Sequence, residues 1–510
     1  MFRFLFALAA AATLGLAPNA ARAEWYEASS AHFVVYSDEQ PEKLKSFATT
    51  LERYDKAFRL LRGFEDPDVG KANRLFVYVV RSTDAVAKLA GEKSIAGFYR
   101  PRAGGSIAIV PRQSGGNDEL DLSPMQILLH EYAHHLMYSV RPNAAYPLWF
   151  SEGWAEFHAT AAFGKDGSVT FGSPPQYRAY SLMSGNWLTI DKLLVADTLK
   201  LTDDQREGLY GRGWLLTHYL TNGGARPGQL NAYILAINQG KSPLEAAKVF
   251  GDLRALDKEL EHYKGRNGFA GRRLSGDALT IGDITLRKLT AGEAATMSVR
   301  ILSKNGVDEK TAPGVYDTAK KVCAPYPNDP GAQLVLAEAA FDAGDYTAAE
   351  AATDRAIAAD PSAVRAYTYK AMARMEVAKK ASDTSKETWR AIRKLISTAN
   401  KLDPEDPEPL ILFYDSFLES DQDVTKNARE GLYYAFVLAP QDPGLRMNVA
   451  SAYMFDNQFA TARKLLQPLA YDPHSGGLAQ AAADLIKEID RRAAAAPPSP
   501  KIKPAPANGT

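Results

Sequence analysis

The C-terminal half of this chain contains a series of Asp-Pro pairs that limits the folds it can adopt. The pairs recur at 329–330, 360–361, 403–404, 442–443 and 472–473. Each pair opens a stretch in which apolar residues recur at helical spacing. The recurrence of Asp-Pro pairs before helical stretches predicts an all-helical region of repeated units over residues 305–491.

The turns between paired helices in this region also repeat. The segments 344–349 (GDYTAA) and 457–462 (NQFATA) occupy equivalent positions. The pattern resembles tetratricopeptide repeats, whose period is about 34 residues. The longer interval between 361 and 404 indicates that one repeat is degenerate or carries an insertion, and an ordinary helical domain is the alternative. Stacked repeats leave a concave face, so the resemblance implies a protein partner bound there, away from any catalytic site.

The first 23 residues have the pattern of a secretory signal peptide. Arg3 precedes an apolar run over residues 4–16, and a small-residue triplet ends at Ala23. Cleavage after Ala23 is expected, which predicts a periplasmic or secreted protein. A membrane anchor is the alternative, but the run is shorter than the about 20 residues that span a bilayer. No later segment is long enough either, so no stable membrane span is expected.

The charge balance and cysteine content narrow the function classes. The 510 residues include 60 Lys and Arg against 60 Asp and Glu, which gives no support for a nucleic-acid partner. Cys323 is the only cysteine, so no internal disulfide can form. At about 150 residues per domain, the length allows two to four domains.

The N-terminal half alternates strand and helix patterns before it becomes helical. The β-rich runs 32–36, 75–80 and 106–110 and a helical segment at 42–61 predict a small mixed sheet. From 123 to about 264 the pattern is helical, and Ser123-Pro124 is a good helix start because serine caps free N–H groups and proline fits the first turn. The segment 279–301 has the alternation of apolar and polar residues that is typical of a strand, but the sequence does not indicate its position in the fold.

A metal-binding pattern lies in the first of these helices. His130-Glu131-Tyr132-Ala133-His134 is an H-E-x-x-H motif, and residues four apart lie on one helix face. Two imidazoles can therefore bind one metal ion. Zn²⁺ is an ion that imidazole ligands bind well. A catalytic zinc needs a third protein ligand and an open position. Glu152, which follows His134 after 17 intervening residues, can complete the set from a second helix.

Here the chain resembles the gluzincin metallopeptidases. Ser151-Glu152-Gly153-Trp154-Ala155-Glu156 is similar to the Asn-Glu-Gly-x-Ala signature of gluzincin aminopeptidases, in which the glutamate before the glycine is the third zinc ligand. The chain is also similar to bacterial gluzincin-like proteins that open with a His-Phe-x-Val strand and carry helical repeats. The similarity covers residues 25–264. It implies an α+β, thermolysin-like domain, with a small mixed sheet and a helical subdomain, over residues 24–304.

A second match to the same family lies further along the chain. Tyr210-Gly211-Arg212-Gly213 resembles the family's Tyr-x-Lys-Gly motif, whose tyrosine stabilises the tetrahedral intermediate. The resemblance assigns this role to Tyr210, and a core tyrosine is the alternative. The strand at 106–110 lies where gluzincins have the edge strand that pairs with a bound peptide. The family's Gly-x-Met-Glu-Asn segment, which holds the substrate's amino group, is absent, so aminopeptidase activity is not expected.

Two carboxylates next to the metal ligands have distinct expected roles. Glu131 is beside a ligand but free of the metal, so it is the expected catalytic base. Glu156, one turn beyond Glu152, is either an acceptor for a ligand imidazole or a solvated helix acid.

The sequence thus predicts an exported zinc metallopeptidase with peptide or protein substrates. Endopeptidase, carboxypeptidase and cross-link cleavage remain open. A peptidase-like scaffold without activity, which binds protein partners through its repeats, is the alternative. The expected order is a signal peptide (1–23), the metallopeptidase domain (24–304), the repeats (305–491) and a disordered Ala/Pro-rich tail (492–510).

Overall fold

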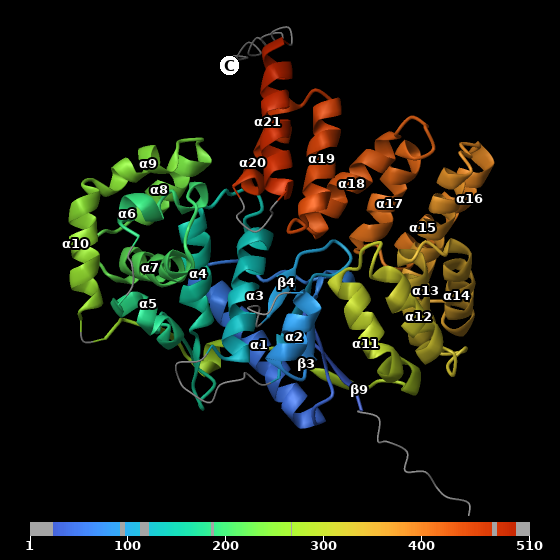
Figure 1. Ribbon diagram of the computed structural model, residues 1–510, viewed down its shortest axis with the longest axis horizontal. Coiled ribbons are helices and arrows are strands. Elements are labelled where there is room, and N and C mark those ends of the chain that lie inside the picture. The colour runs from blue at the N-terminus through green and yellow to red at the C-terminus, as the bar shows by residue number, and fades with distance from the viewer. Residues whose placement is uncertain are drawn as a thin grey trace, which may run out of the picture.

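The computed structural model describes residues 24–91, 97–112, 122–184, 188–266, 268–471 and 477–495. The expected signal peptide and the Asp-Pro pair at 472–473 lie outside the described residues. In Figure 1 a sheet lies near the centre, one group of helices lies to its left, and a series of C-terminal helices extends to its right and above it. The fold is therefore of the predicted α+β class.

The central sheet is mixed and has the strand order β4-β5-β3-β2-β1-β9. The pairs β2–β3 and β3–β5 are parallel, and the other neighbours are antiparallel. This confirms the predicted mixed sheet. Its strands are β1 (Tyr26–Ser29), β2 (Phe33–Ser37), β3 (Leu75–Val80), β4 (Phe98–Arg100), β5 (Ile107–Pro111) and β9 (Thr285–Lys288).

The edge of the sheet differs from the sequence prediction. The run at 106–110 forms β5, which pairs with β3 on one side and β4 on the other. All of its residues are buried, so the prediction that it is the edge strand is wrong. The edge strand next to β5 is β4. Its three residues are too few to show strand periodicity, which is why the sequence analysis missed it.

The two faces of the sheet pack against different helices, because successive strand residues point to opposite sides. Phe33 and Val35 face a core shared with α1 and α3, whereas Val34 and Tyr36 face a core that includes residues of α2 and α11. The helices are α1 (Pro41–Arg62), α2 (Thr83–Ala90), α3 (Pro124–Val140) and α11 (Ala291–Asn305).

A group of helices and a small second sheet lie beside the central sheet. The Ser123 hydroxyl caps α3, with Gln126 bonding back in a capping box, as the Ser-Pro start predicted. The second sheet has the order β6-β7-β8. The elements are α4 (Leu148–Ala159), β6 (Ala162–Phe163), β7 (Val169–Phe171), α5 (Ala179–Ser184), α6 (Ile190–Leu193), α7 (Asp203–Asn222), α8 (Gln229–Asn238), α9 (Pro243–Ala246), α10 (Leu253–Lys264) and β8 (Arg272–Leu274).

The remaining helices pack each against the next along the chain, which confirms the helical repeat region. The last helix continues to Ala495, so residues 492–495 are helical and not part of a tail; the alanines there favour a helix. Among the described residues, no helix is long and apolar enough to cross a membrane. The helices are α12 (Ala312–Cys323), α13 (Pro330–Asp342), α14 (Tyr346–Ala359), α15 (Val364–Lys380), α16 (Lys386–Leu402), α17 (Pro407–Leu418), α18 (Lys426–Leu438), α19 (Pro443–Phe455), α20 (Phe459–Ala470) and α21 (Gly477–Ala495).

The Asp-Pro pairs open helices at only some of the predicted places. Asp329 and Asp442 cap α13 and α19, each with proline in the first turn. The side chains of Asp360 and Asp403 instead each accept a hydrogen bond from the backbone N–H two residues later in the chain, which closes a turn. The prediction is wrong at these two, because an aspartate side chain can satisfy a local turn as well as a helix end. The cap of α17 is Asp406, from a neighbouring Asp-Pro pair.

Helix α11 joins the sheet to the repeats. Met297 and Ile301 pack in the core of the sheet, while Val299 packs with Ala319 and Val335 of the first repeat helices. The boundary expected after residue 304 therefore falls within a helix that both parts share.

Candidate metal centre

The structure brings together the three side chains that the sequence proposed as metal ligands. His130 and His134 lie one turn apart on α3, and Glu152 lies on α4, which packs against it. The two Nε2 atoms are 3.3 Å apart. The Oε2 atom of Glu152 lies 3.4 Å from the His130 Nε2 and 3.7 Å from the His134 Nε2.

These separations fit a tetrahedral zinc site. With zinc–ligand bonds of about 2.0–2.1 Å, two ligands of a tetrahedral ion lie about 3.3–3.4 Å apart. The three donor atoms match this spacing to within a few tenths of an ångström. Two imidazoles and one carboxylate are also a donor set that zinc accepts while one position stays open for water or substrate.

The glycines of the two motifs explain how Glu152 reaches the histidines. A Cβ atom on Gly153 would lie 2.2 Å from the Gly213 carbonyl oxygen, and one on Gly213 would lie 2.7 Å from the Trp149 carbonyl oxygen. Helices α4 and α7 can therefore approach this closely only because both positions lack a side chain. The contact places Glu152 and Tyr210 beside the same histidines.

Tyr210 lies on α7 next to the proposed ligands. Its ring centroid is 6.2 Å from that of His130, and the Arg178 guanidinium lies over the ring at 4.5 Å. The negative charge of Glu152, together with burial, raises the pKa of the Tyr210 phenol. The hydroxyl therefore keeps its proton and can donate a hydrogen bond at neutral pH.

Glu156 is buried behind His130, not solvated. Its Oε1 atom lies 3.7 Å from the His130 Nδ1, on the side of the ring away from the other ligands. The carboxylate accepts hydrogen bonds from the Tyr177 hydroxyl at 2.5 Å and from the Arg178 Nη2 at 3.0 Å. These bonds fix the carboxylate where it can orient the imidazole.

The sequence analysis missed a residue with a similar place beside His134. The Ser151 Oγ lies 3.3 Å from the His134 Nδ1 and 3.3 Å from the Tyr138 hydroxyl. If the His134 Nε2 binds a metal, Nδ1 would carry the ring proton. Its N–H would then donate a hydrogen bond to the Ser151 Oγ. The position of Ser151 directly before Glu152 in the motif is the sequence feature that could have identified it.

The proposed ligands line a cavity of about 560 Å³ that both parts of the chain enclose. Its lining includes the ligands, Glu131, Tyr210 and residues of the edge strand β4. The prediction that the repeats take no part in building this site is wrong, because residues of their last three helices also line the cavity. The repeat residues there are Gln441, Pro443, Arg446, Pro468, Leu469 and Leu478.

The repeats are held in this position by the loop that joins β4 to β5. The Ala103 backbone N–H donates to the Asp442 Oδ2 at 2.7 Å, and the Arg365 Nη1 donates to the Gly104 carbonyl at 3.3 Å. The Gln441 Nε2 donates to the Ser106 Oγ at 3.3 Å. Residues more than 250 positions apart thus place the repeats against the end of β4.

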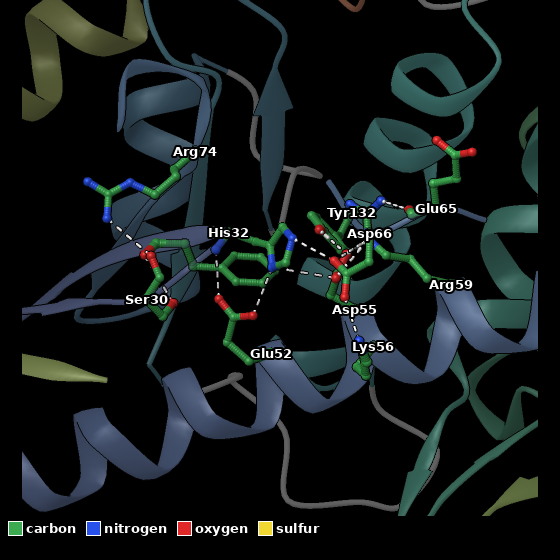
Figure 2. A network of polar contacts seen from close by, with 11 residues as sticks. Ser30, His32, Glu52, Asp55, Lys56, Arg59, Glu65, Asp66, Arg74 and Tyr132 are labelled. Atoms are coloured by element: carbon green, nitrogen blue, oxygen red, sulfur yellow. Dashed lines mark hydrogen bonds and ion pairs between the residues drawn. The ribbon is translucent and has the colours of Figure 1, made fainter. Parts of the chain in front are cut away.

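A second group of ligand-type residues lies elsewhere, around His32 (Figure 2). The His32 Nδ1 lies 2.9 Å from the Glu52 Oε2 and 3.5 Å from the Asp55 Oδ2, and its Nε2 lies 3.2 Å from the Asp66 Oδ1. No metal-ligand spacing predicts this group from the sequence, because its residues come from the bend before β2, from α1 and from a loop.

This second group forms an ion-pair network. Asp55 pairs with the Arg59 Nε at 2.8 Å, and Asp66 pairs with the Lys56 Nζ at 2.7 Å. Burial lowers the pKa of His32, but its hydrogen bond to Glu52 and the nearby carboxylates outweigh this, so the pKa is raised. With His32 protonated, three cations face three carboxylates, which leaves no charge for a metal to neutralise.

Part of this chain is similar to solved structures of tetratricopeptide repeat proteins. No family model matches the chain, and no curated protein sequence matches it. A thermophilic tetratricopeptide repeat protein from Thermus thermophilus is 17% identical over 39% of this chain and 100% of its own, with a TM-score of 0.34. MamA from Desulfovibrio magneticus is 14% identical over 39% of this chain and 96% of its own, with a TM-score of 0.26.

Proposed function

We propose that this protein is an exported zinc metallopeptidase that hydrolyses peptide bonds. The observation that carries the proposal is the convergence of three donor atoms at the spacing of a tetrahedral zinc site. They lie on the wall of a cavity that also contains Glu131 and Tyr210. The gluzincin motifs that contain these residues support the same assignment.

The roles of the side chains follow from their positions around this cavity. Zinc, when bound, lowers the pKa of a water molecule and polarises a carbonyl group. Glu131 lines the cavity beside His130, so its carboxylate accepts the proton of the attacking water and returns it to the leaving amine. Tyr210 donates its hydroxyl proton in a hydrogen bond to the oxygen that becomes negative during attack.

The edge strand supplies a way to hold the substrate. β4 pairs on one side with β5, and its residues line the cavity. An extended peptide can add to such an edge through backbone hydrogen bonds, which would lay its peptide bonds beside the metal ligands. This mode of binding favours cleavage within an extended chain.

Metal analysis and peptide hydrolysis test the proposal together. The purified protein should contain about one zinc per chain and cleave members of a diverse peptide mixture, and a chelator should stop the cleavage. Absence of zinc, even after zinc is supplied, would contradict the proposal. A zinc-loaded protein that cleaves no peptide would favour the inactive scaffold.

Export is tested separately. We expect the expressed protein to be found in the periplasm or medium with Glu24 as its first residue, because the leader ends in a small-residue triplet. N-terminal sequencing of the exported protein measures this. An intact leader on membrane-associated protein would contradict cleavage and favour an anchor.

A further inference from the structure

The repeat helices supply a wall of the metal-site cavity, and the chemistry of that wall bears on the substrate. Two of its polar side chains are engaged within the protein. The Gln441 Nε2 donates to the Ser106 Oγ. The Arg446 guanidinium donates to the carbonyls of Leu465 and Pro440, at 3.2 and 2.8 Å.

The rest of this wall is apolar. Pro443, Pro468, Leu469 and Leu478 complete the part of the lining that the repeats provide. Leu478 remains 40% exposed although it is a large apolar side chain, whereas Leu469 is buried. An apolar side chain that enters the cavity at this wall would remove the remaining Leu478 surface from water, which is favourable.

The part of the lining that β4 provides determines the form of the partner. The edge strand β4 and the repeat helices line the same cavity, and the loop contacts at Ala103, Gly104 and Ser106 hold the two walls together. A volume of about 560 Å³ holds a short segment of polypeptide and excludes a folded domain. A peptide strand paired with β4 sends alternate side chains to opposite sides.

We propose that Leu469, Leu478 and Pro468 form a substrate subsite for a large apolar side chain of an extended polypeptide. The repeats therefore determine specificity directly, and the substrate class is unfolded polypeptide with leucine-like or phenylalanine-like residues. This inference rests on the proposed peptidase function, since the peptide that occupies the subsite is the substrate.

Peptide binding without turnover tests the subsite. The full-length Glu131→Gln variant, loaded with zinc, is titrated with two fluorescent peptides of about ten Gly, Ser and Thr residues, one with a central Leu and one with Ser in its place. We expect the Leu peptide to bind about 10-fold more tightly, in line with burial of one leucine side chain. Fluorescence anisotropy measures both affinities.

Two leucine substitutions in this background give a matched comparison. Leu478→Asn should abolish the preference for the Leu peptide and leave the affinity for the Ser peptide unchanged. Leu402→Asn is the control, because Leu402 is 42% exposed on α16 and does not line the cavity. Both leucines are exposed enough for their variants to fold, and circular dichroism checks that they do.

The outcomes separate the subsite from the peptidase function. If the Leu preference is present and depends on Leu478, the subsite stands even when the parent protein cleaves nothing. If the parent cleaves peptides with zinc but the two peptides bind alike, or the two asparagine variants behave alike, the subsite is overturned and the peptidase function remains.

Discussion

Gly153 of α4 lies directly against the backbone of Gly213 on α7, with no room for a side chain at either position. The first glycine follows Glu152, and the second lies three residues after Tyr210. One helix contact therefore places both a proposed metal ligand and a proposed catalytic hydroxyl.

Gly153→Ala should destabilise the protein, because the added Cβ would lie 2.2 Å from the Gly213 carbonyl oxygen. Overpacking of this kind costs about 1–3 kcal/mol. The melting temperature should fall, and zinc affinity should fall with it because Glu152 moves. Gly314→Ala is the control, since its added Cβ atom would meet nothing within 4 Å apart from its chain neighbours and its own helix backbone, and it should not lower the melting temperature. Equal melting temperatures for the two variants would contradict the proposed contact.

Glu131→Gln should retain zinc but lower turnover by about 10²-fold or more, because glutamine cannot accept the proton of the attacking water. His134→Ala should lose both zinc and activity, since it removes a ligand. Elemental analysis and a peptide cleavage assay measure the two effects. A glutamine variant as fast as the parent would rule out this role for Glu131.

Tyr210→Phe should lower kcat by about 10²-fold with little change in KM, because the hydroxyl acts on charge that develops during the reaction. A tyrosine hydroxyl keeps its proton below its ordinary pKa of about 10, so the variant should show the same loss from about pH 6 to pH 9. Tyr180→Phe is the control, since Tyr180 is 81% exposed. A rise in KM alone would show that Tyr210 only binds substrate.

Asp442→Ala should raise KM, because Asp442 holds the loop next to β4 through the Ala103 N–H as well as capping α19. Asp345→Ala is the matched control, since Asp345 caps α14 in the same way without touching this loop. Each variant should lose about 1 kcal/mol of stability from the cap. If KM rises equally in both, the loop contact has no role in the site.

The His32 network should make stability depend on pH. The pKa of His32 is raised in the folded protein, so its ion pairs stabilise fully below its unfolded pKa of about 6.5 and are lost as pH rises through the folded value. The melting temperature of the parent should therefore exceed that of His32→Gln most at about pH 6, and the difference should shrink toward about pH 9. A difference that grows with pH would show that His32 is neutral when folded.

Features that depend on local spacing could be predicted from the sequence. His130 and His134 share a helix face because four residues make about one turn, and the Ser123 cap acts within its own helix end. Asp329 and Asp442 likewise cap the helices that directly follow them. These contacts join residues that are close together in the chain. A short stretch of sequence therefore contains every residue that each contact needs.

Contacts between distant segments became visible in the three-dimensional structure. The position of β4 at an edge of the sheet and the contacts of Asp442 with Ala103 and of His32 with Asp66 all join separate elements. The contribution of Leu478 to the metal-site cavity is of the same kind. Such contacts arise when whole helices and strands bury their apolar faces together, and no pattern within either segment specifies the partner.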